Sequence, residues 1–325
     1  GSRWVSKVTP KSSCARRSIA TASASVFSPH QPVASVQVWC GTGSIDEDAH
    51  VGAGLSHILE HMLFKGTKTR STSAIAQSVQ DQGGYINAYT SFDRTVYWID
   101  VPREGVGQAL DILADAMMNS TLPPEEYAKE QEVIRREFAM CYDDPDRMMG
   151  QLMFKTAYQR HPYRFPVIGE LQIFDQLTQQ EVLEYYRTRY VPNNLTFVVV
   201  GDVDAAEVYA QLEKYFSPYP ARSLAPGYIA QEPPQKGRRE VNEEFSTELT
   251  RLALAWHVPE ITHPDVPALD LLSTILGDGR SSRLYRQVRE VWFLESRLFP
   301  ILRVIPGCSE STRRWRRSIE SRQSG

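Results

Sequence analysis

The stretch His57-Ile58-Leu59-Glu60-His61 holds two histidines four positions apart, with a glutamate directly before the second. On a helix, residues four apart lie one turn above each other, so both imidazoles can reach one metal ion. The order His-x-x-Glu-His is the inverse of the commoner His-Glu-x-x-His motif of zinc peptidases. Helical spacing places the apolar residues on the opposite face: Leu55, Ile58, Leu59, Met62 and Leu63. An ordinary amphipathic helix with a solvated polar face gives the same pattern.

A second segment, residues 124–141, contains no helix-breaking residue after its first proline and predicts another helix. Glu130 and Glu137 lie seven positions apart within its apolar stripe. The stripe consists of Tyr127, Ile134, Phe138 and Cys141. Burying carboxylates is costly unless a cation or hydrogen-bond donors meet them. A metal shared with His57 and His61 is the simplest partner, since catalytic zinc commonly has three protein ligands. Alternatively, the stripe lies at a domain edge and the glutamates reach water.

Several motifs in one order resemble the pitrilysin/insulinase family of zinc metallopeptidases. The closest likeness is to mitochondrial processing peptidase and its bacterial relatives. Glu137 follows His61 by 76 positions (137 − 61). Further matching segments are LFKGT (63–67), GGYINAYTS (83–91), which resembles the family's GG-x-x-NA-x-T, and NNL (193–195). The resemblance runs from about Pro32 to Tyr219, and more weakly to about Arg289.

The resemblance implies roles for the residues of both helices. The implied zinc ligands are His57, His61 and Glu137. Glu60 is then the general base that takes a proton from the water that zinc activates. Glu130 is a second carboxylate of the catalytic site, which orients a ligand. Cys141 lies on the same helix face as Glu137, so zinc ligation by its thiolate is an alternative.

The resemblance also implies positions that bind substrate. Asn87 and Ala88 resemble edge-strand positions that hold the substrate backbone by strand addition. Arg289 resembles the arginine of an Arg-Glu-x-x-x-Leu-x-Tyr segment that contacts substrate near zinc, although Ser296 stands at the tyrosine position. The implied function is a zinc-dependent metalloendopeptidase that hydrolyses extended or unfolded peptides.

Two other functions are compatible with parts of the pattern. One is a zinc-binding but inactive or partner-dependent subunit of a heterodimeric processing peptidase, whose partner is a homologous subunit. The other is S-ribosylhomocysteine lyase, which shares His-x-x-Glu-His. That enzyme is a short single domain with a cysteine as third ligand, so the chain length, Glu137 and the 83–91 segment oppose it.

Helical and strand patterns mix without a βαβ period, which predicts an α+β fold. We expect a mixed helix and antiparallel-sheet sandwich half followed by a truncated second similar half. Strands are predicted at 34–39, 85–89, 94–101, 195–200 and 249–256. Helices are predicted at 73–82, 106–119, 151–158, 178–190, 205–216, 268–276 and 281–290. The expected domains are a disordered or non-native N-terminus (1–29), a zinc-binding peptidase domain (30–220), a linker (221–240), a partial second homologous domain (241–296) and an irregular basic tail (297–325).

Composition sets further bounds on function. At 325 residues the chain is long enough for two domains, and its net charge of −3 gives no reason to invoke nucleic acid. No apolar run approaches ~18 residues, so no transmembrane segment is expected. Residues 1–29 hold five basic residues and no acidic one, a composition that a transit peptide can also have. The sequence leaves the compartment open. Cys40 and Cys141 are expected to be reduced core residues.

Overall fold

A computed structural model describes residues 14–19, 22–27, 32–224, 227–248 and 250–290. The chain divides into two compact units. The first, which we call the sheet unit, comprises residues 1–141 and 165–228, and the second unit comprises 142–164 and 229–325. Within the described parts of the chain, no helix is both long and apolar enough to cross a membrane.

The sheet unit is built on a six-stranded sheet in the order β1-β2-β6-β3-β5-β4. Its strands are β1 (Cys14–Ile19), β2 (Ala22–Phe27), β3 (Val33–Cys40), β4 (Tyr85–Thr90), β5 (Thr95–Pro102) and β6 (Leu195–Gly201). Neighbours are antiparallel except β2 and β6, which are parallel. The strand β4 therefore lies at one edge of the sheet, where it contacts α1.

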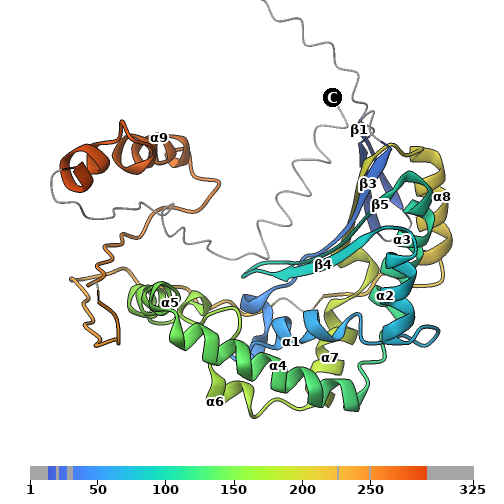
Figure 1. Cartoon of the computed structure of the whole chain (residues 1–325), viewed down its shortest axis with the longest axis horizontal. Helices are drawn as coiled ribbons and strands as arrows, with labels where there is room; N and C mark the ends of the chain where they lie inside the picture. The colour runs from blue at the N-terminus through green and yellow to red at the C-terminus, as the bar shows by residue number, and fades with distance from the viewer. Residues whose placement is uncertain (1–13, 20–21, 28–31, 225–226, 249, 291–325) are drawn as a thin grey trace, which may run out of the picture. The chain divides into compact units, whose positions relative to one another are not determined.

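One face of this sheet forms the core. Burial alternates along β3 and β6, as expected where successive side chains point to opposite faces. The helices α3 (Val106–Asn119) and α8 (Ala205–Phe216) lie along the sheet and contact each other (Figure 1). Both carry a buried apolar stripe, which explains why they cover this face.

The remaining helices of the sheet unit include the two that carry the converging polar side chains, α1 and α4. They are α1 (Leu55–Met62), α2 (Thr72–Gln80), α4 (Pro124–Asp143, in this unit up to Cys141), α6 (Leu171–Phe174) and α7 (Gln179–Arg189). Short 3-10 turns occur at Ser44–Asp46, Asp48–His50, Arg103–Gly105 and Pro192–Asn194. The helix α1 contacts both β4 and α7. Its first turn begins at Gly54, whose φ of 70° and close approach to the Ile168 carbonyl leave no room for a Cβ.

The second unit has no strand among its described residues. Its elements are α5 (Pro145–Ala157), a 3-10 turn (Pro162–Arg164), α9 (Val266–Gly277) and a π-helical segment (Tyr285–Arg289). The strand predicted for 249–256 is wrong over its described residues, 250–256, which have no regular structure. Leu252, Leu254 and Trp256 are exposed there. A strand needs a hydrogen-bonded neighbour, and the described part of this unit provides none.

Most of the other predicted elements are confirmed. The four strands predicted in the sheet unit and the helices at 73–82, 106–119 and 205–216 agree with the structure to within about two residues at each end. The predicted cap at Thr178 is confirmed, since its side chain accepts from the Glu181 backbone in a capping box. The helix predicted from residue 151 is longer and begins at Pro145, capped by Asp144. The α+β fold class is confirmed as a mixed helix and mainly antiparallel sheet architecture.

Two segments of residues 1–29 have regular structure in place of the predicted disorder. Cys14–Ile19 and Ala22–Phe27 are the strands β1 and β2, and β2 pairs in parallel with β6. Backbone hydrogen bonds to a distant strand stabilise them, and the small, polar residues of this region do not indicate such a pairing. The rest of 1–29 and the predicted tail, 297–325, lie outside the described residues.

Candidate metal centre

The helix α1 presents its polar triplet on one side and its core residues on the other. Leu55, Ile58, Leu59 and Met62 are fully buried. The side chains of His57 and His61 are only 17% and 18% exposed, because α4 lies against that face. The polar side of α1 is therefore not a freely solvated helix face, which was the alternative to a metal-binding helix.

Three side chains from α1 and α4 converge. His57 Nε2 lies 3.6 Å from Glu137 Oε2, and His61 Nε2 lies 3.8 Å from Glu137 Oε1. One ligand atom from each residue lies within 4.8 Å of the others, and no second such group occurs among the described residues. Tetrahedral zinc with bonds of about 2.0–2.2 Å holds its ligand atoms about 3.3–3.6 Å apart, close to the two distances from Glu137 to the histidines. The donor set fits zinc, and Cys141, the alternative ligand, is not part of the group.

Glu130 lies behind His61 rather than among the converging atoms. Its Oε2 is 3.0 Å from His61 Nδ1, and its Oε1 is 2.6 Å from Lys65 Nζ. Burial raises its pKa, but the hydrogen bonds from Lys65 and His61 together outweigh burial, and the net pKa is lowered. An ionised Glu130 accepts a hydrogen bond from the Nδ1–H of His61, which leaves the lone pair of Nε2 for a metal. In the alternative interpretation both glutamates reach water; the side chain of Glu130 is only 9% exposed, whereas that of Glu137 is 37% exposed.

His57 lacks such a partner. Its Nδ1 is buried and makes no hydrogen bond with the described residues. Burial, and secondarily repulsion from His61, lowers the pKa of His57 to about 3. The imidazole is therefore neutral over the physiological range, which is the form that binds a metal.

Glu60 lies between the two histidines in sequence and meets the end of β4. Thr90 Oγ1 donates a hydrogen bond of 2.5 Å to Glu60 Oε2. The pKa of Glu60 is raised, chiefly by burial and further by the Glu137 carboxylate, against the opposing effects of Thr90 and His61. A carboxylate with a raised pKa is suited to accepting and returning a proton near neutral pH.

The edge strand β4 carries the two predicted substrate-binding residues. Asn87 is exposed and Ala88 is half-buried. The backbone N–H of Ala88 donates to Asn87 Oδ1 at 2.8 Å, and Asn87 Nδ2 donates to the Tyr85 hydroxyl at 2.6 Å. This N–H therefore points away from β5, toward the free edge of the sheet. Arg289 ends the π-helical segment of the second unit, and its side chain lies outside the described residues.

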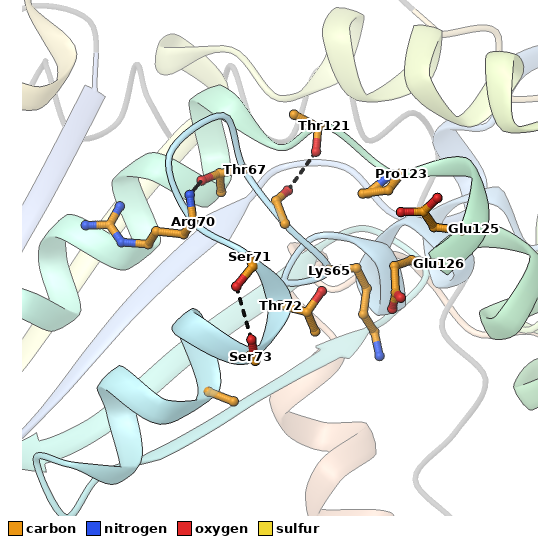
Figure 2. A pocket seen from close by; sticks show the side chains of 12 residues that line it. Lys65, Thr67, Arg70, Ser71, Thr72, Ser73, Thr121, Pro123, Glu125 and Glu126 are labelled. Carbon is orange, nitrogen blue, oxygen red and sulfur yellow. Dashed lines mark hydrogen bonds between the residues drawn. The ribbon is translucent and has the colours of Figure 1, made fainter.

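A polar cavity of about 550 Å³ adjoins the site on the Lys65 side. Figure 2 shows hydroxyl groups of Thr72 and Ser73 and the carboxylates of Glu125 and Glu126 around it. None of the three converging residues lines this cavity. Lys65 joins the two regions because its ammonium group pairs with Glu130.

Sequence reasoning assigned no role to Lys65 or Thr90, although both lie within the quoted motifs. Lys65 follows His61 by four positions, beyond the end of α1, and reaches Glu130 only because α4 packs there. Thr90 reaches Glu60 because β4 contacts α1. A helical or strand period within one segment cannot show either contact. Cys40 and Cys141 are buried free cysteines, as predicted.

Comparison with known proteins places this geometry in a family. A sequence model described as "Insulinase (Peptidase family M16)" matches residues 23–170, and one described as "Peptidase M16 inactive domain" matches 176–292. The chain belongs to the insulinase family, peptidase family M16.

Relatives and solved structures agree with this assignment. The "Uncharacterized zinc protease YmxG" of Bacillus subtilis is 34% identical over 256 residues, which cover 79% of this chain and 61% of the relative. A "Probable mitochondrial-processing peptidase subunit beta, mitochondrial" of Arabidopsis thaliana is 32% identical over 246 residues, covering 75% and 46%. A protease from Helicobacter pylori has a similar structure, with a TM-score of 0.75 and 27% identity, over 86% of this chain and 68% of that one. The chain spans about 61% of the length of the first of these relatives.

Proposed function

We propose that this chain hydrolyses peptide bonds as a zinc-dependent metalloendopeptidase, with zinc held by His57, His61 and Glu137. The convergence of the three ligand atoms within 4.8 Å carries the proposal. Two histidines and one carboxylate leave one coordination position open, as catalytic zinc sites do. The zinc proteases among the relatives support the choice of metal and of reaction.

Zinc bound at these residues would supply Lewis-acid chemistry, lowering the pKa of water and polarising the scissile carbonyl. Glu60 accepts the proton of the attacking water and passes it to the leaving amine nitrogen. The Thr90 hydroxyl holds one oxygen of Glu60, so the other remains available for the proton. Glu130 and Lys65 hold His61 in the tautomer that presents Nε2.

The free edge of β4 supports an extended peptide as substrate. An extended chain can add to a sheet edge through main-chain hydrogen bonds. The Ala88 N–H points to this edge and is bonded to the Asn87 side chain. A substrate carbonyl would replace the Asn87 amide oxygen at that N–H and free Asn87 to bond the peptide. Binding along β4 runs the peptide past Thr90, next to Glu60.

A partner-dependent subunit is the second candidate. One relative is named as a beta subunit, and the chain spans 46% of that relative. We therefore also propose that a homologous chain or domain completes the substrate site, with Arg289 contributing to it. The predicted domain bounds, 30–220 for zinc binding and 241–296 for a second homologous domain, remain part of this proposal.

Zinc stoichiometry tests the site directly. The purified chain should bind about one zinc per molecule. His57→Ala, His61→Ala and Glu137→Gln should each lose most of this zinc, because each removes one of three ligands. Cys141→Ala tests the alternative ligand, and Glu132→Gln on the exposed side of α4 is the matched control. Both should bind zinc like the parent, and retained zinc in all three ligand variants would overturn the proposal.

A further inference from the structure

The helix α1 begins without a capping side chain of its own. The first backbone N–H groups of a helix have no partner within the helix and need an acceptor from elsewhere. Serine, threonine, aspartate or asparagine usually provides it. Here the cap position is Gly54, and its approach to the Ile168 carbonyl excludes any side chain. The turn that carries His57 therefore depends on an acceptor supplied from another segment.

Glu47 is that acceptor. Its Oε1 accepts a hydrogen bond of 2.8 Å from the Ser56 N–H, nine positions further along the chain. Glu47 is 1% exposed, and its Oε2 is buried without a hydrogen-bond partner among the described residues. Burial raises the pKa of Glu47 to about 8, against the lowering effect of the backbone donors of α1. Protonation near neutral pH avoids the cost of a buried charge.

Ser56 is also held through its side chain. Its Oγ lies 2.9 Å from the Tyr185 hydroxyl, which donates to the Gly43 carbonyl at 3.3 Å. Ser56 is 1% exposed, and Tyr185 comes from α7. Backbone and side chain of the residue directly before His57 are thus fixed from two separate segments, by Glu47 and by Tyr185.

His57 has greater need of this arrangement than His61. Metal-binding histidines usually donate their second ring nitrogen to a neighbour that sets the ring orientation. His61 has Glu130 in this role, but His57 Nδ1 is buried and has no hydrogen-bond partner among the described residues. The position of the His57 ring must then follow from the position of the backbone that carries it.

We propose that Glu47 is a positioning residue of the zinc site, which places the His57 ring by fixing the first turn of α1. This inference rests on the proposed function, because it takes His57 as a zinc ligand. Glu47 contacts neither His57 Nε2 nor the other ligands by any hydrogen bond or ion pair found among the described residues. Its effect on zinc is indirect, through Ser56.

The test compares zinc dissociation constants of the full chain by chelator competition. Glu47→Ala should raise the constant about tenfold or more, the scale on which residues that orient metal ligands act. Glu47→Gln preserves a neutral group with an acceptor oxygen and should stay within about threefold of the parent. The matched control is Asp204→Ala, because Asp204 caps α8 by accepting from Ala206 N at 2.7 Å and Glu207 N at 3.1 Å. It removes a comparable cap and should leave zinc affinity unchanged.

A second readout separates positioning from general stability. The visible absorption spectrum of the cobalt-substituted protein reports the geometry around the metal, and it should change in Glu47→Ala but not in Asp204→Ala. Parent-like zinc affinity in Glu47→Ala, or an equal loss in Asp204→Ala, would overturn the proposal. Should Glu47→Ala fold poorly, Glu47→Met decides, since it fills similar space and lacks the carboxyl acceptor for the Ser56 N–H. Weaker zinc binding in Glu47→Met supports the proposal, and unchanged binding overturns it.

His57→Ala, measured in parallel, keeps the two proposals distinguishable. If His57→Ala retains zinc, the proposed metal site itself is wrong. If His57→Ala loses zinc while Glu47→Ala binds it like the parent, only the role of Glu47 is wrong.

Discussion

His57 and His61 lie one turn apart on α1, yet different kinds of interaction stabilise the two ends of this helix. The His61 end is held by charge, because ionised Glu130 bonds both the His61 ring and the Lys65 ammonium group. The His57 end is held by hydrogen bonds to Ser56, from the buried Glu47 carboxyl at its backbone N–H and from the Tyr185 hydroxyl at its side chain. Two histidines of the same candidate metal site are therefore held in place by different kinds of interaction.

The difference follows from where each end lies. The C-terminal end of α1 is followed by a turn that exposes Lys65 to the adjoining polar cavity, so an ion pair there remains partly solvated. The N-terminal end is enclosed by α7 and by the segment around Ile168. A charge buried there would be costly, and a neutral acid accepts the helix N–H groups at lower cost. Four expected outcomes test the site, and the last three bear directly on this comparison.

The largest expected effect concerns Glu60, which belongs to neither support. Glu60→Gln should retain zinc but lower peptide turnover by about 10²–10⁴-fold, because an amide cannot take up the proton of water. Turnover of an unfolded fluorogenic peptide and zinc content would be measured on the same sample. Glu132→Gln is the control for loss of a carboxylate. Parent-like turnover in Glu60→Gln would show that proton transfer belongs to another residue.

The second prediction concerns the charged interactions at the His61 end of α1. Glu130→Gln should weaken zinc binding by about 10–100-fold, since the His61 ring loses its charged acceptor. Lys65→Met should act in the same direction and less strongly. Asp115→Asn is the control, because Asp115 is also a carboxylate paired with a cation, Arg70, but is absent from the site. Its variant should change stability rather than zinc affinity.

A double variant tests whether the supports at the two ends of α1 are independent. If the supports are independent, the losses of zinc-binding free energy in Glu130→Gln and Glu47→Ala should add within about 0.5 kcal/mol in the double variant. Strong non-additivity would show that both residues belong to one network, and the comparison would fail.

The last expected effect is on the pH dependence of stability, where the two ends have opposite signs. The pKa of Glu47 is raised to about 8, so its contribution is fully present below the ordinary carboxyl value and is lost as pH rises toward 8. The pKa of Glu130 is lowered, so its contribution is present at neutral pH and is lost in acid. Urea unfolding of the parent and Glu47→Gln should diverge with pH between 4.5 and 8, by at most about 1.4 kcal/mol per unit.

The sign of that divergence is the useful result. The parent should lose stability relative to Glu47→Gln as pH rises. In this range the Glu47 carboxyl is protonated in the folded protein and ionised in the unfolded chain, so unfolding of the parent releases a proton, and the variant has no such proton. Asp46 has a pKa raised to about 6 by burial and is common to both proteins, so it cancels in the difference. A difference that is flat across this range would show that Glu47 is already ionised, and that both ends of α1 are held by charge.

Much of the fold could be predicted where one segment carries its own period. The apolar faces of α1, α3 and α8 and the alternation along β3 and β6 are local patterns, and the structure confirms these elements. The strands β1 and β2 were missed because their support comes from β6, about 170 residues away. The opposite error occurred at 250–256, where a strand-like pattern meets no neighbouring strand in the described chain.

The site divides in the same way. Spacing within α1 alone predicted that His57 and His61 share a helix face, and the spacing of Glu130 and Glu137 predicted one face of α4. Helical geometry makes these relations independent of the rest of the protein. Only the packing of α4 against α1 decided that Glu137 approaches both histidines while Glu130 lies behind His61. Only tertiary contacts brought Thr90 to Glu60 and Glu47 to the first turn of α1. Such contacts join segments whose separation in sequence has no period, so no local pattern encodes them.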